Sequence, residues 1–470
     1  MRASWTWGAG VDSNAAMKTS LYALAALTAI SIPHIALADD HLDAAATALT
    51  SDTIAYDFVE GITTEVGPRQ AGTEAEKRGR DWAVAWLKAN GFANVADEPF
   101  EMPTWVPGKN PSAEIVSPFP QPFVIAPLGN SVSTEPEGIT AEVVEFGNVA
   151  ELRAAPDGSL AGKIAYISHS MTPTQDGSQY GFAGPARWVG AGIAAGKGAV
   201  ATVIKSVGTD YHRNPHTGGT SFRGVEATPA GALSLPDAAN LERMFDRANG
   251  QPITMKLVLT PRDLGVTTSG NVVGEIVGRD PALPPVLLAC HLDSWWNGTG
   301  AFDDGAGCGI VAAAAKHASR DGQPLRTIRV LFAGAEEVGL FGSIEYSKAH
   351  LDEPIAVALE SDFGADRIWR FESNFRDTNP DLHAKIAASI ARFGVADSSI
   401  VATGGADINI ARDQKTAIID LQQDGTRYFD LHHTPDDTLD KIDPVQLRQN
   451  VAVWTEVARI LANEPGAIKP

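Results

Sequence analysis

Basic residues are scarce in this sequence and form no cluster. Its 470 residues include 37 lysines and arginines against 57 aspartates and glutamates, which gives a formal net charge of −20. An acidic chain without a basic run repels the phosphate backbone of nucleic acids. We therefore expect no nucleic-acid partner.

Cysteine is also scarce. The two cysteines, Cys290 and Cys308, are too few for a disulfide framework, and they lack the Cys-x-x-Cys spacing of a zinc or redox pair. They could be buried thiols, or they could pair between a strand and the helix after it. We expect free thiols, because small buried residues often serve for packing at such positions.

The sequence also lacks long apolar runs. The one candidate, residues 21–32, is too short to span a bilayer comfortably. It follows Met17 and Lys18 and precedes the small-residue pattern Ala-Leu-Ala at 36–38, which is the layout of a secretory signal. We expect residues 1–38 to be a leader that is removed on export to the periplasm or the extracellular space. We expect no membrane span.

The rest of the chain has the composition of a globular protein, with 44% hydrophobic and 20% charged residues. Apolar runs predict strands at 92–100, 270–277, 286–290, 326–332, 355–359 and 416–421. Helical patterns occur at 73–90, 307–319, 340–350, 380–393 and from Asp443 onward. Strands that alternate with helices predict an α/β fold, in which helices flank a mostly parallel mixed sheet.

A smaller module interrupts this pattern. Prolines recur between 103 and 127, which argues against regular structure there. Strand-like runs at 140–146, 163–168 and 199–204, with a helix at 189–198, follow before the main pattern resumes. We therefore divide the chain into residues 39–110 and 266–470 of a main domain and an inserted α/β domain at 111–265.

One loop of the inserted domain contains two histidines. His212 and His216 could bind a metal ion, but both lie in the polar segment 209–222. We expect them to be solvated loop histidines.

Polar side chains follow three strands of the predicted main sheet. His291 and Asp293 follow one strand, the pair Glu336 and Glu337 follows the next, and Asp362 follows the third. In open α/β folds, ligands bind at this carboxyl edge. Each motif alone would fit a solvated surface, but together they are hard to interpret as ordinary surface.

Further candidate ligands come from two loops, with Asp303 and Asp304 in one and His432 and His433 in the other. Histidine nitrogen and carboxylate oxygen are the ligands of hydrolytic zinc enzymes. A two-metal site can share one carboxylate, and a further carboxylate must stay off the metals as general base. The sequence therefore predicts a metallohydrolase.

Taken in order, these motifs resemble the M28 family of zinc exopeptidases, and most closely its plasma glutamate carboxypeptidase branch. The matching runs are 291–295, 300–305, 335–343, 360–362, 404–407 and 424–444, with Gly-Pro-Arg at 67–69 near the N-terminus. The inserted module resembles the protease-associated domain of this branch. The resemblance implies a zinc exopeptidase fold, two Zn²⁺ ions and peptide substrates.

The resemblance also implies a role for each ligand. One zinc ion would be held by His291 and Asp362, the other by Glu337 and His433, and Asp303 would bridge them. Asp304 and Glu360 could compete as ligands, but the register of the motifs favours Asp303 and Asp362.

Three further residues receive roles in the same way. Glu336 would be the general base that activates a metal-bridging water, and Asp293 would orient His291. His432 would lie where some relatives have a tyrosine that assists the oxyanion. If the segment is extended, His432 and His433 point in opposite directions. The family further implies a cis peptide bond between Asp303 and Asp304.

The range of activities in the family favours aminopeptidase as the activity of this chain. The alternatives are a carboxypeptidase or dipeptidase of the same fold and a non-catalytic peptide-binding protein. Arg412 or Arg427 could bind a substrate carboxylate, and Asp407 could bind a substrate ammonium group. The inserted domain could recruit partners, cover the site or set the geometry of a homodimer.

Overall fold

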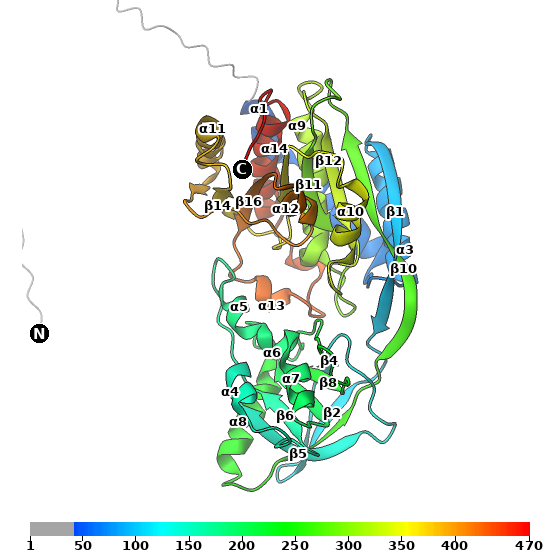
Figure 1. Cartoon of the computed structure of the whole chain (residues 1–470). Helices are drawn as coiled ribbons and strands as arrows, with labels where there is room; N and C mark the ends of the chain where they lie inside the picture. The colour runs from blue at the N-terminus through cyan, green and yellow to red at the C-terminus, as the bar shows by residue number, and fades with distance from the viewer. Residues whose placement is uncertain (1–41) are drawn as a thin grey trace, which may run out of the picture. The chain divides into compact units, whose positions relative to one another are not determined.

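Two eight-stranded sheets organise residues 42–470, the part of the chain that the computed structural model describes (Figure 1). The predicted leader at 1–38 lies outside the described residues. Within 42–470, no helix combines the length and the apolar character that crossing a bilayer requires.

The first sheet carries the predicted main pattern. Its strands lie in the order β1 (Ala93–Val106), β10 (Arg262–Ile276), β12 (Ile328–Ala333), β11 (Val286–His291), β13 (Val357–Glu360), β16 (Ala417–Gln423), β14 (Ile368–Ser373) and β15 (Ala396–Asp397). The central strands β12, β11, β13 and β16 are parallel, and β1, β10 and β14 pair antiparallel at the flanks. The predicted fold class, a mostly parallel mixed sheet flanked by helices, is confirmed.

Helices cover this sheet on both faces. They are α1 (Leu42–Ser51), α2 (Ile54–Gly61), α3 (Glu74–Ala89), α9 (Ala306–Ala318), α10 (Phe341–His350), α11 (Pro380–Ile390), α12 (Asn409–Gln414), α13 (Tyr428–Leu431) and α14 (Pro444–Ala462). Helices α9 and α14 pack against each other and against β11, whereas α10 packs with α12 beside β10.

Strand β11 shows why both faces need helices. Its residues are all buried, and successive side chains of a strand point to opposite faces. Leu288 belongs to the core cluster that includes α9 and α14, and its neighbour Leu287 belongs to a separate cluster with α10 and α12. A continuous apolar run is the pattern of a strand buried on both sides.

The second sheet is formed between residues 112 and 258. Its strands lie in the order β3 (Gln121–Phe123), β2 (Ser112–Ser117), β9 (Thr254–Val258), β5 (Ile139–Phe146), β6 (Ile164–Ile167), β7 (Ala201–Lys205), β8 (Ala230–Leu233) and β4 (Ile125–Pro127). Its helices are α4 (Val149–Ala154), α5 (Gln179–Ala183), α6 (Pro185–Trp188), α7 (Gly190–Gly196) and α8 (Leu235–Arg247). The expected boundary at 265 falls inside β10, and the division into domains stays a prediction.

Some elements were not predicted from the sequence. Helix α8 has a clear start signal, because Ser234 accepts a hydrogen bond from the backbone N–H of Asp237 and a proline occupies its first turn. Strand β14 is short, and the sequence pattern predicts no element there.

The expectation of free thiols is wrong, because Cys290 and Cys308 form a disulfide. Cys290 lies in β11 and Cys308 in the first turns of α9, which packs back onto β11 and brings the two Cα atoms to 5.2 Å. The bond therefore ties the strand to the helix on either side of the loop that contains Asp303.

We predict that protein unfolded without a reductant has no titratable thiol, and that two thiols appear after reduction. The crosslink spans 18 residues. Its loss in the double variant, with Cys290→Ala and Cys308→Ala together, should lower the free energy of unfolding by about 3 kcal/mol. Denaturant titration measures this. Two thiols in the unreduced chain would contradict the bond.

Candidate active site

The carboxyl edge of the first sheet brings the predicted ligands together in two groups. His291 Nε2 lies 3.1 Å from Asp303 Oδ1 and 3.4 Å from Asp362 Oδ1. His433 Nε2 lies 2.6 Å from Glu337 Oε2 and 3.4 Å from Asp303 Oδ2. Asp303 therefore presents one carboxylate oxygen to each group.

A turn places the two adjacent histidines on the same side. His433 has a positive φ of 58°, and the N–H of Thr434 bonds back to Leu431, so the segment is not extended. The rings of His432 and His433 stack with their centroids 3.6 Å apart, and His432 Nε2 lies 3.8 Å from Asp303. The expectation for an extended segment, in which the two rings diverge, does not apply.

Backbone carbonyls orient the two histidines of the ligand groups. His291 Nδ1 lies 3.0 Å from the carbonyl of Asp293, and His433 Nδ1 lies 3.0 Å from the carbonyl of Thr217. Each ring then donates its Nδ1 hydrogen to that carbonyl, which leaves Nε2 to face the carboxylates.

The side chain of Asp293 contacts both the expected histidine and the backbone of Glu336. Its Oδ1 accepts a hydrogen bond from the N–H of Glu336 at 3.1 Å and lies 3.7 Å from His291 Nδ1. The backbone of Asp293 thus orients the histidine, while its carboxylate holds the backbone of Glu336.

Other carboxylates hold the loop around Asp303. Asp437 accepts hydrogen bonds from the N–H groups of Phe302 and Asp303 at 2.6 and 3.2 Å. Asp304 accepts from the N–H groups of His291 and Gly307, and the peptide bond between Asp303 and Asp304 is cis, as expected. Asp304 therefore supports the backbone around the ligand groups.

Arg69 supports the same loop through its carbonyl groups. Its guanidinium is fully buried and donates to the carbonyls of Leu292, Thr299 and Gly300 at 2.5, 2.6 and 2.9 Å. Burial lowers the pKa of Arg69, and the surrounding carboxylates, Asp437 first among them, oppose this shift. Arg69, the last residue of the Gly-Pro-Arg motif, therefore connects β11 to the loop that presents Asp303.

Burial dominates the electrostatics of the site. It raises the pKa of Glu336 and of Glu337 well above the usual range, and neighbouring carboxylates add to both shifts. Burial also lowers the pKa of His433 to about 4, with a further contribution from Arg187. Burial alone would lower the pKa of His291, but Asp362 and other carboxylates raise it well above its usual value.

The side chains around Asp303 offer ligand atoms that suit positively charged ions. Several buried carboxylates meet at Asp303, and Asp303 Oδ2 is buried without a hydrogen-bond partner. Histidine nitrogen with carboxylate oxygen is the donor set that zinc takes in hydrolytic sites. Cations at these positions would offset the mutual repulsion of the acids.

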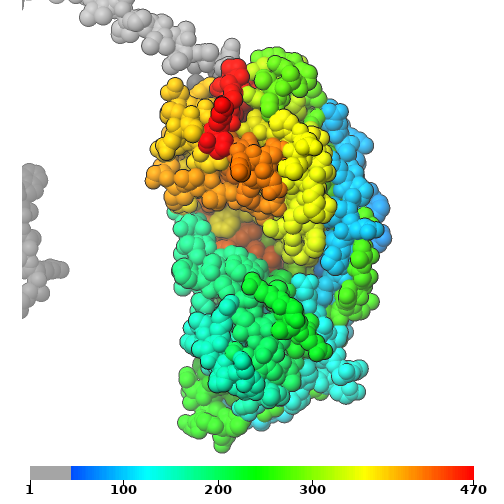
Figure 2. All heavy atoms as spheres, viewed as in Figure 1, coloured from blue at the N-terminus to red at the C-terminus, as the bar shows by residue number. Residues whose placement is uncertain are grey.

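A cavity of about 650 Å³ opens onto these groups, and Figure 2 shows a hollow between the cyan and green segment of the second sheet and the yellow to red segment. Six residues line it from the loops and turns around the first sheet: Asp303, Glu336, Glu337, Asp362, His432 and His433. Tyr180, Arg187 and Thr220 line it from the segment of the second sheet. Those three carried no recognisable signal in the sequence.

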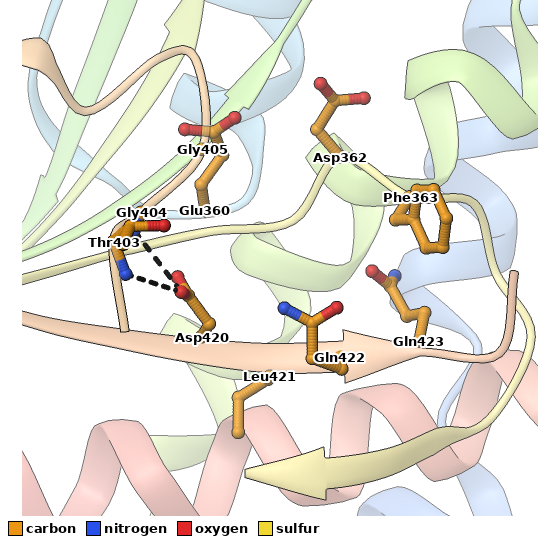
Figure 3. Close-up of a pocket in the computed structure, with 10 residues that line it drawn as sticks. All are labelled: Glu360, Asp362, Phe363, Thr403, Gly404, Gly405, Asp420, Leu421, Gln422 and Gln423. Carbon is orange, nitrogen blue, oxygen red and sulfur yellow. Dashed lines mark hydrogen bonds between the residues drawn. The ribbon is translucent and has the colours of Figure 1, made fainter. Parts of the chain in front are cut away.

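A smaller cavity of about 220 Å³ lies beside Asp362 (Figure 3). Its other acids are bound by backbone groups: Asp420 accepts from Thr403 and Gly404, and Glu360 accepts from Asp407. Figure 3 shows the carboxylate of Asp362 turned away from Asp420. This arrangement leaves Asp362 to the larger cavity.

The expectation of solvated loop histidines is wrong for His216. His216 is buried, contacts Asp210 through Nε2 and donates from Nδ1 to the carbonyl of His432 at 2.7 Å. His212 is partly exposed and lies 3.1 Å from Asp436. Neither belongs to a cluster of potential metal ligands among the described residues.

Comparison with known proteins identifies the family. The profile of peptidase family M28 matches residues 271–458. Carboxypeptidase Q of Bos taurus is 32% identical over 416 residues, which covers 87% of this chain and 85% of the relative, and that of Homo sapiens is 30% identical with the same coverage. The chain belongs to peptidase family M28.

Solved structures agree with this assignment. An M28 peptidase precursor from Shewanella amazonensis SB2B is 42% identical and superposes with a TM-score of 0.87 over 92% of this chain and 98% of that one. An aminopeptidase from Aneurinibacillus sp. strain AM-1 is 22% identical, with a TM-score of 0.62 over 91% and 98%, and shares the fold. The resemblance seen in the sequence is confirmed, and this M28 peptidase is a zinc-dependent metallopeptidase.

We predict that Arg69→Met destabilises the M28 peptidase by roughly 3 kcal/mol and lowers its zinc content, because buried carbonyls lose their donor and buried acids lose a cation. Denaturant titration and elemental analysis measure the two effects. Arg78→Met, at an exposed position of α3, is the matched control. Unchanged stability and zinc content in Arg69→Met would refute this role.

Proposed function

We propose that this M28 peptidase is an exported exopeptidase that holds two zinc ions. His291 and Asp362 would bind one ion, Glu337 and His433 the other, and Asp303 both. The observation that carries the proposal is that the two oxygens of Asp303 face two separate pairs of donors. Bound zinc would polarise the scissile carbonyl and make a water molecule more acidic.

Glu336 is the general base in this proposal. It lines the cavity beside the two ligand groups, and Asp293 fixes its backbone. A carboxylate in this place could take a proton from the attacking water and later give one up. Glu336 would pass that proton to the amine nitrogen of the departing product.

His432 would assist the developing oxyanion. Burial lowers its pKa well below the usual value, so the ring is neutral and carries one N–H. Its Nδ1 is buried without a hydrogen-bond partner, and the ring lines the cavity. A donor aimed at the reacting carbonyl oxygen stabilises the charge that forms there.

The charged residues considered for terminus recognition do not line the cavity. Arg427 pairs with Asp366, and Arg412 donates to Gly405 and Asn409. Asp407 is buried, and it does not line the cavity either. The sequence-based preference for an aminopeptidase therefore has no support from these residues. The presence of a full set of candidate ligands and a base favours catalysis over a non-catalytic binding role.

Export is supported by the leader pattern at 1–38 and by the disulfide, since disulfides persist in oxidising compartments. A homodimer stays a prediction.

We predict that Glu336→Gln retains zinc but loses peptide hydrolysis by about 10²–10⁴-fold, because the amide cannot accept the proton. Mass spectrometry of the products measures chelator-sensitive hydrolysis, and elemental analysis measures the zinc content. Glu345→Gln removes a carboxylate from a surface ion pair with Lys348 and should behave like wild type. Near-normal activity in Glu336→Gln would exclude Glu336 as the base.

We predict that Asp303→Ala loses zinc, because each proposed site loses one oxygen of the shared carboxylate. The zinc content after dialysis measures this. Asp321→Ala, at an exposed position, is the matched control. Two tightly bound zinc ions in Asp303→Ala would remove Asp303 as the shared ligand.

A further inference from the structure

The two adjacent histidines of the site lie at the centre of a tight backbone turn. The turn closes where the N–H of Thr434 donates to the carbonyl of Leu431 at 3.0 Å. His432 has φ −44° and ψ 121°, and His433 has φ +58°. These angles match a type II turn, in which glycine or asparagine usually follows the first central residue. His433 therefore has a backbone conformation that residues other than glycine seldom adopt.

The turn has a less strained alternative. Rotation of the central peptide, between His432 and His433, would convert it to a type I turn, which has negative φ at both central positions and suits most residues. The rotation would reverse the carbonyl of His432 and change the direction of the His433 ring, which now faces Asp303 and Glu337. The strained form persists only if its surroundings fix this carbonyl.

His216 binds the carbonyl of that central peptide. Its Nδ1 donates to the carbonyl oxygen of His432 at 2.7 Å, and its Nε2 faces the carboxylate of Asp210. A carbonyl can only accept, so Nδ1 carries a hydrogen, and the carboxylate on the far nitrogen fixes the orientation of the ring. Among the described residues, His216 is the one side chain that donates to this carbonyl.

The backbone around His216 accommodates this ring closely. His216 is 1% exposed, and its own N–H donates to the hydroxyl of Ser206 at 3.0 Å. A Cβ atom at Gly208 would overlap the imidazole, so only a bare backbone fits there. Asp210 also accepts a hydrogen bond from the N–H of His212 at 3.2 Å. Contacts within the segment of the second sheet therefore fix the ring that holds the turn.

The next peptide of the turn is held separately. The carbonyl of His433 accepts from the side-chain amide of Asn297 at 2.7 Å and from the N–H of Thr217 at 3.3 Å. Neither group contacts the carbonyl that would reverse in a type I turn. The choice between the two turn types therefore falls to His216.

We propose that His216 and Asp210 form a positioning pair, which fixes the central peptide of the turn so that His432 and His433 both face Asp303. The inference rests on the proposed function, in which His433 binds one zinc ion and His432 assists the oxyanion. Loss of the pair would weaken the zinc ion at His433. The ion on the other side of Asp303 has no proposed ligand in the turn and would be retained.

The test separates the two nitrogens of His216. An asparagine amide nitrogen can take the place of Nδ1, and a glutamine amide nitrogen that of Nε2. His216→Gln should therefore release the turn and weaken one of the two zinc ions by about 10- to 100-fold, the usual effect of removing a group that orients a metal ligand. His216→Asn should bind both ions within a few-fold of wild type. Competition with a chelator of known affinity measures the dissociation constant of each ion.

A second variant and a kinetic measurement distinguish positioning from a general loss of stability. Asp210→Asn should weaken the same zinc ion several-fold, because the ring loses the carboxylate that orients it. At saturating zinc, His216→Gln should lower kcat roughly tenfold with little change in KM, since His432 shares the peptide that rotates. His169→Gln, at a partly exposed histidine of the same segment, is the matched control.

Three results would overturn the inference and leave the proposed two-zinc exopeptidase standing. They are wild-type zinc affinities in His216→Gln, equal weakening of both ions in His216→Gln and His216→Asn, and unchanged zinc affinity in Asp210→Asn. Zinc-loaded wild type without chelator-sensitive peptide hydrolysis would instead refute the proposed function.

Discussion

The constraint on which the site depends is the burial of several carboxylates around Asp303. A buried carboxylate without a partner is strongly disfavoured, and neighbouring acids increase the cost. The chain provides histidines, backbone N–H groups and the buried arginines Arg69 and Arg187, but Asp303 Oδ2 still lacks a hydrogen-bond partner. Bound cations would offset this cost, so the same acids that oppose folding are suited to hold zinc.

The surrounding structure resolves this conflict by separating roles among similar residues. Asp303 and Asp362 face the histidine nitrogens, whereas Asp304 and Asp437 accept backbone hydrogen bonds. Arg69 binds carbonyl groups of the loop between β11 and α9. Acids adjacent in sequence therefore differ in function according to which way the backbone turns.

Much of the candidate site could be predicted because its motifs are local. His291, Glu337 and Asp362 each follow a parallel strand, and parallel strands end at one edge. The disulfide and the stacking of His432 on His433 could not be predicted, because both depend on how a helix or turn packs after the strand. Periodicity predicts that an element exists but not what it contacts across the fold.

The segment of the second sheet shows most clearly that contacts across the fold cannot be predicted from sequence patterns. Its composition predicted a separate α/β module, yet it also supplies Thr217, whose carbonyl accepts from His433, and Arg187, which lines the cavity. Hydrogen bonds between residues some two hundred positions apart leave no pattern in either segment. Since Thr217 contacts the proposed zinc ligand His433 and Arg187 lines the cavity, the geometry of the site depends on the contact between the segments of the two sheets.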